Sequence, residues 1–130
     1  REMMGWLTHL QHIRDKNVIL VGILDSKVDE YGRTNYELQI EGAKTARELP
    51  GIVDEVITMT IMGGEGHEPY RAFVCQTLNE WGYPAKDRSG KLEVIEEPHL
   101  GKLLNKLNSS PIKKDLTFVN PQSQTNQKEV

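Results

Sequence analysis

Apolar residues near the start of the chain recur at the spacing of an α-helix. They share one face of the 3.6-residue turn, at Met3, Met4, Leu7, Leu10 and Ile13. This spacing predicts a helix over residues 2–15, and no N-capping residue precedes it. Because the chain starts inside this helical pattern and without a methionine, we expect it to be a piece of a longer protein.

An unbroken apolar run follows this helix. Residues 18–24 read Val-Ile-Leu-Val-Gly-Ile-Leu and are bounded by polar residues, which is typical of a strand buried on both faces. A helix, a short turn and a buried strand form half of a βαβ unit. The pattern therefore predicts an α/β fold with a mostly parallel sheet and flanking helices.

Residues 25–41 are polar and charged, with Gly32 and Arg33 at their middle. Tyr31 comes before this glycine and Tyr36 after it, which leaves two interpretations open: a two-stranded excursion or a mobile loop. Helical propensity returns over residues 43–49. Pro50, followed by a glycine, is expected to end that helix.

A β-hairpin is predicted in the C-terminal half of the chain. Residues 55–62 alternate at strand period, residues 63–66 are a glycine-rich turn, and residues 70–78 provide the second strand. A loop over residues 79–90 follows, and then a short extended piece over residues 92–95.

The last apolar stripe belongs to a helix with Pro98 near its first turn. The members of the stripe are Leu100, Leu103, Leu104 and Leu107. Beyond Asn108 the composition shifts to Ser, Asn, Gln, Pro and Lys. We therefore predict one folded domain over residues 1–107 and a disordered tail over residues 108–130.

Charge and cysteine content narrow the class of protein. The 130 residues have a formal net charge of −3, which argues against a basic coat over the whole surface but leaves room for a local basic loop. The single cysteine, Cys75, lies in an apolar run and is expected to be a buried thiol. With no signal peptide and no apolar stretch near about 18 residues, we expect a cytoplasmic protein with no membrane partner.

Two glycine-containing segments superficially resemble phosphate-binding loops. Such a loop needs glycines whose backbone amides face the phosphates, then a lysine and a hydroxyl residue. In residues 42–45 an alanine separates Gly42 from Lys44, and residues 63–66 contain no lysine. We interpret the first segment as a helix start and the second as a turn, so the chain lacks a phosphate-binding loop.

The histidines do not have the spacing of a metal site. His9 and His12 are three residues apart on the first predicted helix, whereas His67 and His99 lie in unrelated segments. A zinc site would need a further ligand at suitable spacing. We therefore expect no metal site in this chain.

Basic and aromatic residues gather in and beside the polar excursion. Ligands of open α/β sheets collect beyond the carboxyl ends of the strands. A loop there that carries cations and rings could hold a single nucleic-acid strand through phosphates and stacked bases. The candidate DNA-binding residues are Lys27, Arg33, Lys44 and Arg47. Carboxylates within the excursion dilute this charge, and an ordinary solvated loop is the alternative interpretation.

A second pair of cations lies in the turn that Pro84 leads. Lys86 and Arg88 are two residues apart, so in extended chain their side chains point the same way and could reach one anionic group. A solvated turn is the alternative interpretation.

Four segments, in this order, resemble one family. They are NVILVGILDSKVDEYGR (residues 17–33), RELPGIVDEVITM (47–59), RAFVCQT (71–77) and PAKDRSG (84–90). They look like the C-terminal half of phage-encoded RecA-like (P-loop) recombination ATPases, the Sak-type or AAA-domain nucleotide-binding phage proteins, which assist single-strand annealing and recombination. The likeness spans about Met3 to Leu107, and the order and spacing of the segments carry it.

The resemblance implies a partial RecA-like core whose phosphate loop, with ATP and Mg²⁺, belongs to the full-length protein, and no cofactor for this segment alone. It implies a DNA-contacting loop at residues 25–41, and further copies of the chain and single-stranded DNA as partners, in the host cytoplasm if the protein is phage-encoded. Lys86 and Arg88 would act as catalytic cations on the ATP of a neighbouring subunit. Relatives carry His or Gln near the end of the strand at residues 18–24, where this chain has Ile23 or Leu24.

Two other functions stay open. One is a non-catalytic α/β module that oligomerises or binds a partner through an exposed sheet edge. The other is a small nucleic-acid-binding protein that needs no nucleotide. The missing phosphate loop favours these two if the chain is the entire protein, and its start inside a helix favours the ATPase.

Overall fold

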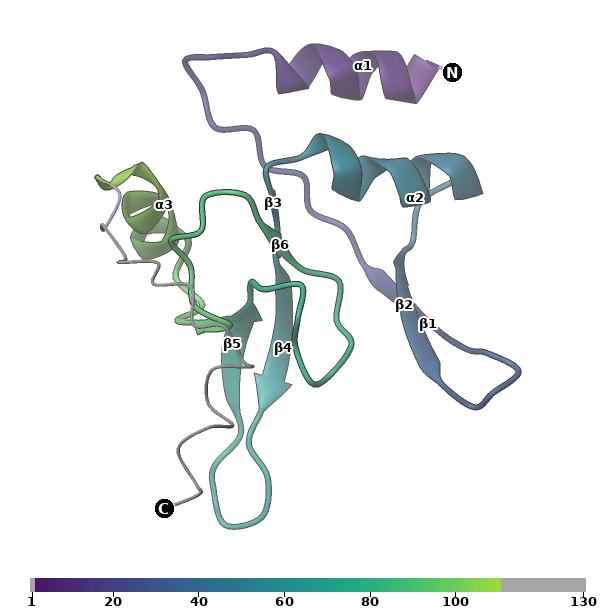
Figure 1. Ribbon diagram of the computed structural model, residues 1–130, viewed down its shortest axis with the longest axis vertical. Helices are drawn as coiled ribbons and strands as arrows, with labels where there is room; N and C mark the ends of the chain where they lie inside the picture. The colour runs from purple at the N-terminus through teal and green to yellow at the C-terminus, as the bar shows by residue number, and fades with distance from the viewer. Residues whose placement is uncertain (1, 111–130) are drawn as a thin grey trace, which may run out of the picture.

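The computed structural model describes residues 2–110, and it has a mixed α/β architecture (Figure 1). The helices are α1 (Glu2–Gln11), α2 (Ala43–Ile52) and α3 (Leu100–Asn108). The strands are β1 (Leu24–Val28), β2 (Thr34–Leu38), β3 (Glu55–Val56), β4 (Thr58–Met62), β5 (Tyr70–Val74), β6 (Lys86–Asp87) and β7 (Ile95–Glu96). The α/β class predicted from the sequence is therefore confirmed.

The strands form three small sheets rather than one large one. Their orders are β1–β2, β3–β6 and β4–β5–β7. Every strand pairing within residues 2–110 is antiparallel. The mostly parallel sheet predicted from the sequence is thus not present in the described part of the chain.

The apolar run at residues 18–24, predicted to be a buried strand, is the largest difference from expectation. Only Leu24 lies in a strand, as the first residue of β1, and the side chains before it are open to solvent, with Val21 94% and Ile23 71% exposed. A parallel strand needs a neighbour that runs in the same direction after a crossover connection. No segment within residues 2–110 provides that neighbour, so residues 18–23 lie outside every sheet and remain exposed.

Residues 25–41, for which two interpretations were open, fold as a hairpin. β1 and β2 pair in register from Leu24 opposite Leu38 to Val28 opposite Thr34. The amide of Gln39 donates to the carbonyl of Ile23 at 2.8 Å and extends the pairing by one bond. The hairpin projects away from the β4–β5–β7 sheet (Figure 1), and the two-stranded interpretation is confirmed.

α2 continues two residues past the point where Pro50 was predicted to end it. Proline lacks an amide hydrogen and so removes one helical hydrogen bond, but in the last turn this loss is small. The ammonium of Lys86 compensates there, since it donates to the carbonyls of Pro50 at 3.0 Å and Val53 at 2.8 Å. The helix therefore ends at Ile52.

The predicted C-terminal hairpin is confirmed as β4 and β5, with Thr58 opposite Val74 and Met62 opposite Tyr70. β5 stops at Val74, short of the predicted residue 78. The amide of Cys75 donates instead to the carbonyl of Val94 at 3.0 Å, and the chain then turns away. The predicted loop at residues 79–90 contains the two-residue strand β6.

The core consists of two clusters that involve the β4–β5–β7 sheet. The first contains Met62, Ala72, Val74 and Ala85, with Trp81 and Tyr83 packed against it. The second contains Cys75, Leu92 and Leu103, with Ile57, Phe73 and Leu107 packed against it. Cys75 is fully buried, which confirms the expectation from the sequence, and this burial raises the pKa of its thiol to about 12.

α3 covers the second cluster and begins at Leu100, two residues after Pro98. His99 caps it, because its Nδ1 accepts a hydrogen bond from the amide of Lys102 at 3.1 Å. Leu103 is buried, whereas Leu100 is 44% exposed and lies at the edge of the predicted stripe. The predicted disordered tail lies, from residue 111 onward, outside the described residues.

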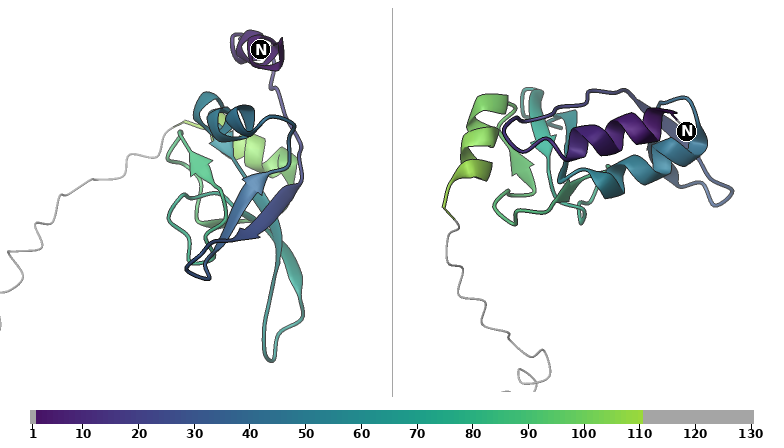
Figure 2. Two further views of the ribbon diagram at one scale, coloured as in Figure 1. Left: turned by 90° about the vertical axis from the view of Figure 1, so that its right-hand side faces the viewer. Right: turned by 90° about the horizontal axis from the view of Figure 1, so that it is seen from above.

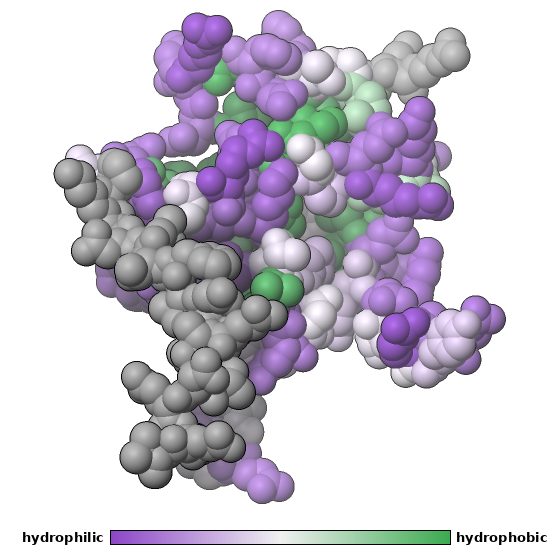
Figure 3. Space-filling model, viewed as in Figure 1, coloured by the Kyte–Doolittle hydropathy of each residue, from purple (hydrophilic) through white to green (hydrophobic). Residues whose placement is uncertain are grey.

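α1 lies alongside α2, at the opposite end of the molecule from the β4–β5 loop (Figures 1 and 2). It ends at Gln11, before the predicted residue 15, and the Gln11 side chain donates to the carbonyl of Ile52 at 3.1 Å. In the view of Figure 1, apolar residues are exposed among polar ones in the upper half of the molecular surface (Figure 3).

In the described part of the chain, none of the helices has the length and apolar character needed to span a bilayer.

Candidate functional site

The tip of the β1–β2 hairpin is held by one carboxylate. Asp29 Oδ1 accepts hydrogen bonds from the amides of Tyr31 at 2.9 Å and Arg33 at 2.8 Å. Gly32 has a φ of 75°, a conformation that glycine adopts without strain. The backbone hydrogen bond from Arg33 is the main reason that the pKa of Asp29 is lowered. The tip is therefore an ordered turn that stays anchored while Asp29 is ionised.

This turn presents a ring and a cation together. The Arg33 guanidinium lies over the Tyr31 ring, 5.2 Å from its centroid, and its Nε donates to Asp29 Oδ2 at 3.1 Å. The Arg33 side chain is 73% exposed, and Tyr31 is 74% exposed. A planar cation on an aromatic face offers both charge and a stacking surface to a ligand.

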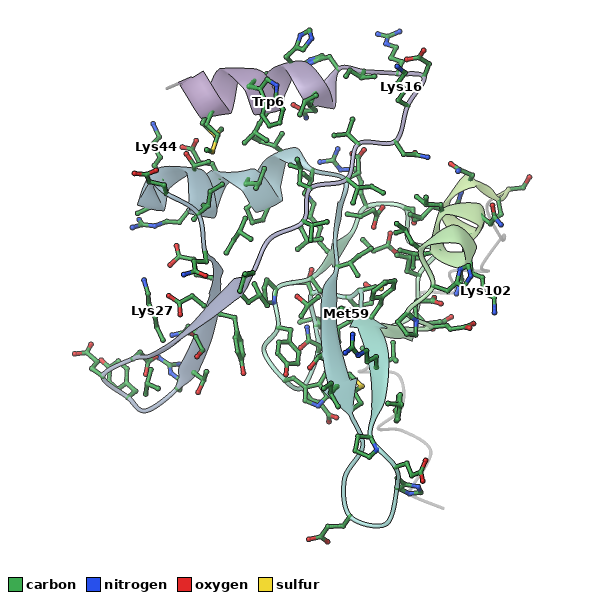
Figure 4. The ribbon with its side chains drawn as sticks, turned by 180° about the vertical axis from the view of Figure 1, so that it is seen from behind. Trp6, Lys16, Lys27, Lys44, Met59 and Lys102 are labelled. Atoms are coloured by element: carbon green, nitrogen blue, oxygen red, sulfur yellow. The ribbon has the colours of Figure 1, made fainter. Side chains whose placement is uncertain are left out.

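The other three predicted DNA-binding residues lie on two elements, Lys27 toward the tip of the hairpin, opposite Asn35, and the other two on the helix that follows it. Lys27 is on β1, and Lys44 and Arg47 are exposed on α2. Lys27 and Lys44 extend toward the same edge of the molecule in Figure 4. A hollow of about 200 Å³ lies between β1, β2 and the first turns of α2, and Lys27 is among its lining residues. The fold thus brings Lys27 and Lys44 to one side of the molecule, although not into one cluster.

Carboxylates offset much of this positive charge. Lys27 lies 3.6 Å from Glu37, and Lys44 lies 3.8 Å from Glu48. Residues 25–41 contain two cations and five carboxylates. Attraction of phosphates by this hairpin is therefore weak, and stacking on rings must supply a large part of any affinity for a nucleic-acid strand.

The two glycine-containing segments, residues 42–45 and 63–66, do not have the geometry of a phosphate-binding loop. Gly42 is the N-cap of α2, and the Lys44 side chain that follows points to Glu48. Residues 63–66 lie in the loop between β4 and β5, with no helix after them. A phosphate loop needs consecutive backbone amides at the start of a helix that follows a buried strand. The described residues provide no such arrangement.

Of the two predicted catalytic cations, Lys86 is engaged within its own chain. Besides the carbonyls of Pro50 and Val53, its ammonium lies 3.5 Å from the carbonyl of Gly51. These groups end α2 and carry the negative end of the helix dipole, which a cation stabilises. In this structure Lys86 fixes the end of α2.

Arg88 lies at the surface beyond β6. Its Nη1 donates to Asp54 Oδ1 at 2.6 Å, and the two side chains are 54% and 75% exposed. Such an exposed pair is worth about 1 kcal/mol or less, so another anion can compete with Asp54 for the guanidinium. The Arg88 side chain, unlike that of Lys86, can therefore leave its partner for another anion with little loss of folding free energy.

Two carboxyl groups that sequence reasoning missed face each other in the β3–β6 pair, Glu55 opposite Asp87. Burial, with a hydrogen bond to Asp87 and its charge, raises the pKa of Glu55 to about 7. Burial opposes ionisation of Asp87 as well, but hydrogen bonds from Ser89, the Leu92 amide and Glu55 outweigh it and lower the pKa of Asp87. Below about pH 7 the pair therefore holds one proton, carried by Glu55.

An aromatic hollow was also missed. It has a volume of about 360 Å³ and includes Tyr70, Trp81 and Tyr83 among its lining residues. Tyr36 on β2 lies against Tyr83, with ring centroids 4.9 Å apart. One sequence signal was available, because residues 81 and 83 are two apart and in extended chain would point the same way.

Within residues 2–110, no group of three or more His, Cys, Asp or Glu side chains is arranged to hold a metal ion. His9 lies on α1, His67 in the β4–β5 loop and His99 at the start of α3. His12 directly follows α1, so the four histidines lie in three separate regions of the described chain.

Comparison with known proteins gives one family match. The family model described as the AAA domain matches residues 1–89, a span that includes the β1–β2 hairpin and the turn of Lys86 and Arg88. No curated protein matches the chain at the significance required. No solved structure matches it either.

The shared proton predicts a pH dependence of stability. Between pH 4.5, the ordinary pKa of a glutamate, and about pH 7, the native state keeps a proton on Glu55 that the unfolded chain releases. The free energy of unfolding should therefore fall as pH rises through this window. Glu55→Gln, which cannot release a proton, should remove that slope in urea unfolding measured from pH 4.5 to pH 8.

Glu41→Gln, at an exposed carboxylate, is the matched control and should keep the wild-type slope. An unchanged slope in Glu55→Gln would show that the proton is not held at this pair.

Proposed function

The chain belongs to the AAA domain family, a nucleotide-binding class of ATPase module, and we propose that it is the C-terminal portion of a RecA-like ATPase that assists recombination and annealing of single-stranded DNA. Its part in that protein is to contact the strand with the β1–β2 hairpin and to offer cations to a neighbouring subunit. The observation that carries the proposal is the ordered hairpin tip, where Arg33 lies over Tyr31 and both are exposed. The proposed location is the cytoplasm.

The geometry of the hairpin supports a role in contacting a strand. An exposed ring with an arginine on its face suits a base and its adjoining phosphate. Lys27 on β1 and Lys44 on α2, which extend toward the same edge in Figure 4, would contact further phosphates. Arg47, also exposed on α2, would contribute a third contact. Asp29 orders the tip before any ligand binds, which lowers the entropy cost of binding.

ATP and Mg²⁺ would be bound by a phosphate loop that these 130 residues do not contain. In the homo-oligomer that we propose, Lys86 and Arg88 face the ATP of an adjoining subunit. Arg88 is the better suited of the two, since its partner is one exposed carboxylate. Lys86 would have to leave the carbonyls at the end of α2.

We expect Lys27→Ala combined with Arg33→Ala to weaken binding of single-stranded DNA. Each phosphate contact contributes about 0.7 to the slope of log affinity against log salt, so losing two should flatten the slope by roughly 1.4. The measurement is fluorescence anisotropy of a labelled oligothymidine at several salt concentrations.

Lys16→Ala combined with Lys102→Ala removes the same charge from other parts of the molecule (Figure 4). This matched control should keep the wild-type slope. Equal slopes in both double variants would show that Lys27 and Arg33 do not contact DNA phosphates, and the hairpin would then be an ordinary solvated loop.

Arg88→Ala, made in the ATPase that contains this chain, should lower ATP turnover by about 10³-fold or more, as loss of an arginine that acts across a subunit interface does. Thermal unfolding followed by circular dichroism should change little, because the pair with Asp54 is exposed. Lys86→Ala should lower turnover and stability together, because the carbonyls at the end of α2 lose their donor.

Asp54→Ala is the control for the loss of the ion pair and should keep turnover. If Arg88→Ala also kept it, the role of Arg88 across the interface would be wrong.

The uncovered apolar run favours a second candidate function, a non-catalytic module that oligomerises. Val18, Ile19 and Leu20 are each 42–50% exposed, in addition to Val21 and Ile23. A contiguous apolar surface of this kind marks an association site. Both candidates require self-association, but only the first requires binding of DNA and an effect on ATP turnover.

We therefore expect the chain to self-associate, as measured by light scattering. Ile19→Lys combined with Val21→Lys should shift the population toward monomer without changing the circular dichroism spectrum. Met59→Lys combined with Ile61→Lys alters exposed apolar residues on β4 (Met59 is labelled in Figure 4) and should leave association unchanged. A monodisperse wild-type monomer would contradict both candidates.

A further inference from the structure

The aromatic hollow lies on one face of the β4–β5–β7 sheet. Thr60 and Met62 of β4 and Tyr70 of β5 line it from the sheet, and Trp81 and Tyr83 line it from the loop that follows β5. Tyr70 is 53% exposed, and the hollow opens to solvent. At about 360 Å³ it has the size of a small-molecule site.

The loop that carries the two rings is held in place by side chains. Asn79 Nδ2 donates to the carbonyl of Tyr83 at 2.9 Å, and Asn79 Oδ1 accepts from the amide of Tyr83 at 3.0 Å. The hydroxyl of Thr58 donates to the carbonyl of Pro84 at 2.6 Å. Trp81 and Tyr83 are therefore positioned before any ligand arrives, which limits the entropy cost of stacking against them.

The chemistry of the lining suits a flat and uncharged group. None of the lining residues carries a charge. Their polar side-chain groups are the hydroxyls of Thr60, Tyr70 and Tyr83 and the indole N–H of Trp81, and the hydroxyls of Thr60 and Tyr83 lie 3.1 Å apart. A phosphate or a carboxylate would find no cation here. A nucleobase, which has a π face and hydrogen-bonding edges, matches both the rings and the polar atoms.

A contact between two tyrosine rings joins the hairpin to the edge of the hollow. Tyr36 of β2 lies against Tyr83, with centroids 4.9 Å apart and planes inclined by 39°. Tyr31 lies five residues earlier, at the hairpin tip, which is at most about 17 Å along the strand. Tyr36 therefore links the hairpin to the rings of the hollow, and Tyr31 offers a further ring at the hairpin tip.

We propose that the aromatic hollow is a stacking site for a base of single-stranded DNA whose backbone follows the β1–β2 hairpin. This inference rests on the proposed function. It also explains how a hairpin with more carboxylates than cations holds a strand, because bases stacked on Tyr36, Trp81 and Tyr83 replace phosphate contacts as the main source of affinity.

The test uses intrinsic fluorescence of the whole chain with Trp6→Phe, which leaves Trp81 as the single tryptophan. An oligothymidine of ten nucleotides should quench Trp81, because a base stacks on its ring. An abasic oligonucleotide of equal length, with the same phosphates and no bases, should not. Quenching by both, or by neither while the oligothymidine is bound, would overturn the inference.

A second test measures the affinity of variants for the oligothymidine. Trp81→Ala should weaken binding of the oligothymidine by about tenfold, the loss expected for one stacked base, and should leave the salt slope unchanged. Trp6→Ala removes the other tryptophan, which is 58% exposed on α1 (Figure 4), and should leave affinity unchanged. Because Trp81 also packs on the core, Tyr70→Ala provides a milder variant at an exposed ring and should weaken binding in the same direction.

The two hypotheses fail in different ways. Wild-type affinity in Trp81→Ala and Tyr70→Ala, with a salt slope that still depends on Lys27 and Arg33, would overturn the stacking site and leave the proposed function standing. No binding of the oligothymidine by the wild-type chain would overturn both. Equal affinity for the abasic oligonucleotide would mean that the strand is held by its phosphates alone, and the stacking site would again be wrong.

Discussion

The pairing of β3 with β6, two residues on each side, connects the end of α2 with the second core cluster. Lys86 reaches from it to the end of α2. Asp87 accepts hydrogen bonds from the amides of Ser89 at 2.9 Å and Leu92 at 2.9 Å, which lead to the second core cluster. The amide of Arg88 donates to the carbonyl of Asp54 at 3.2 Å. These links meet at one short ladder, and when Glu55 loses its proton two carboxylates face each other across it, which disfavours the pairing.

The same junction gives Lys86 and Arg88 different roles, although the sequence presents them as a pair. Alternation along an extended chain does place residues 86 and 88 on one side. The Lys86 side chain reaches the end of α2, where backbone carbonyls accept hydrogen bonds from its ammonium. Arg88, further from the helix, meets only the exposed carboxylate of Asp54. The distinction depends on a contact between residues more than thirty positions apart, which spacing along the sequence does not encode.

Local patterns predicted local structure well in this chain. The hairpin of β4 and β5 follows from alternation and the turn at residues 63–66, and the hairpin of β1 and β2 was one of two interpretations left open. The approximate extent of α2 and α3 follows from propensity and apolar spacing. The run at residues 18–24 was predicted wrongly, because composition reports what a segment tends to bury and not whether a neighbouring strand exists to cover it. The Glu55–Asp87 pair escaped prediction for the same reason, since it requires the register of two distant strands.

The candidate site shows how the balance between charge and stacking changes once the fold is known. In the sequence, the cations of residues 25–41 are the main candidates for contacts with a nucleic acid, and the tyrosines are secondary candidates. In the structure, Lys27 and Lys44 lie near carboxylates, whereas Tyr36 and Tyr83 meet from separate elements and extend the surface toward Trp81. Exposed ion pairs are worth little and weaken with salt, but a ring positioned by buried neighbours keeps its stacking surface at any ionic strength. A strand held on this protein would therefore depend more on its bases than on its backbone, and would be distinguished from a paired duplex, whose bases are not free to stack on the protein.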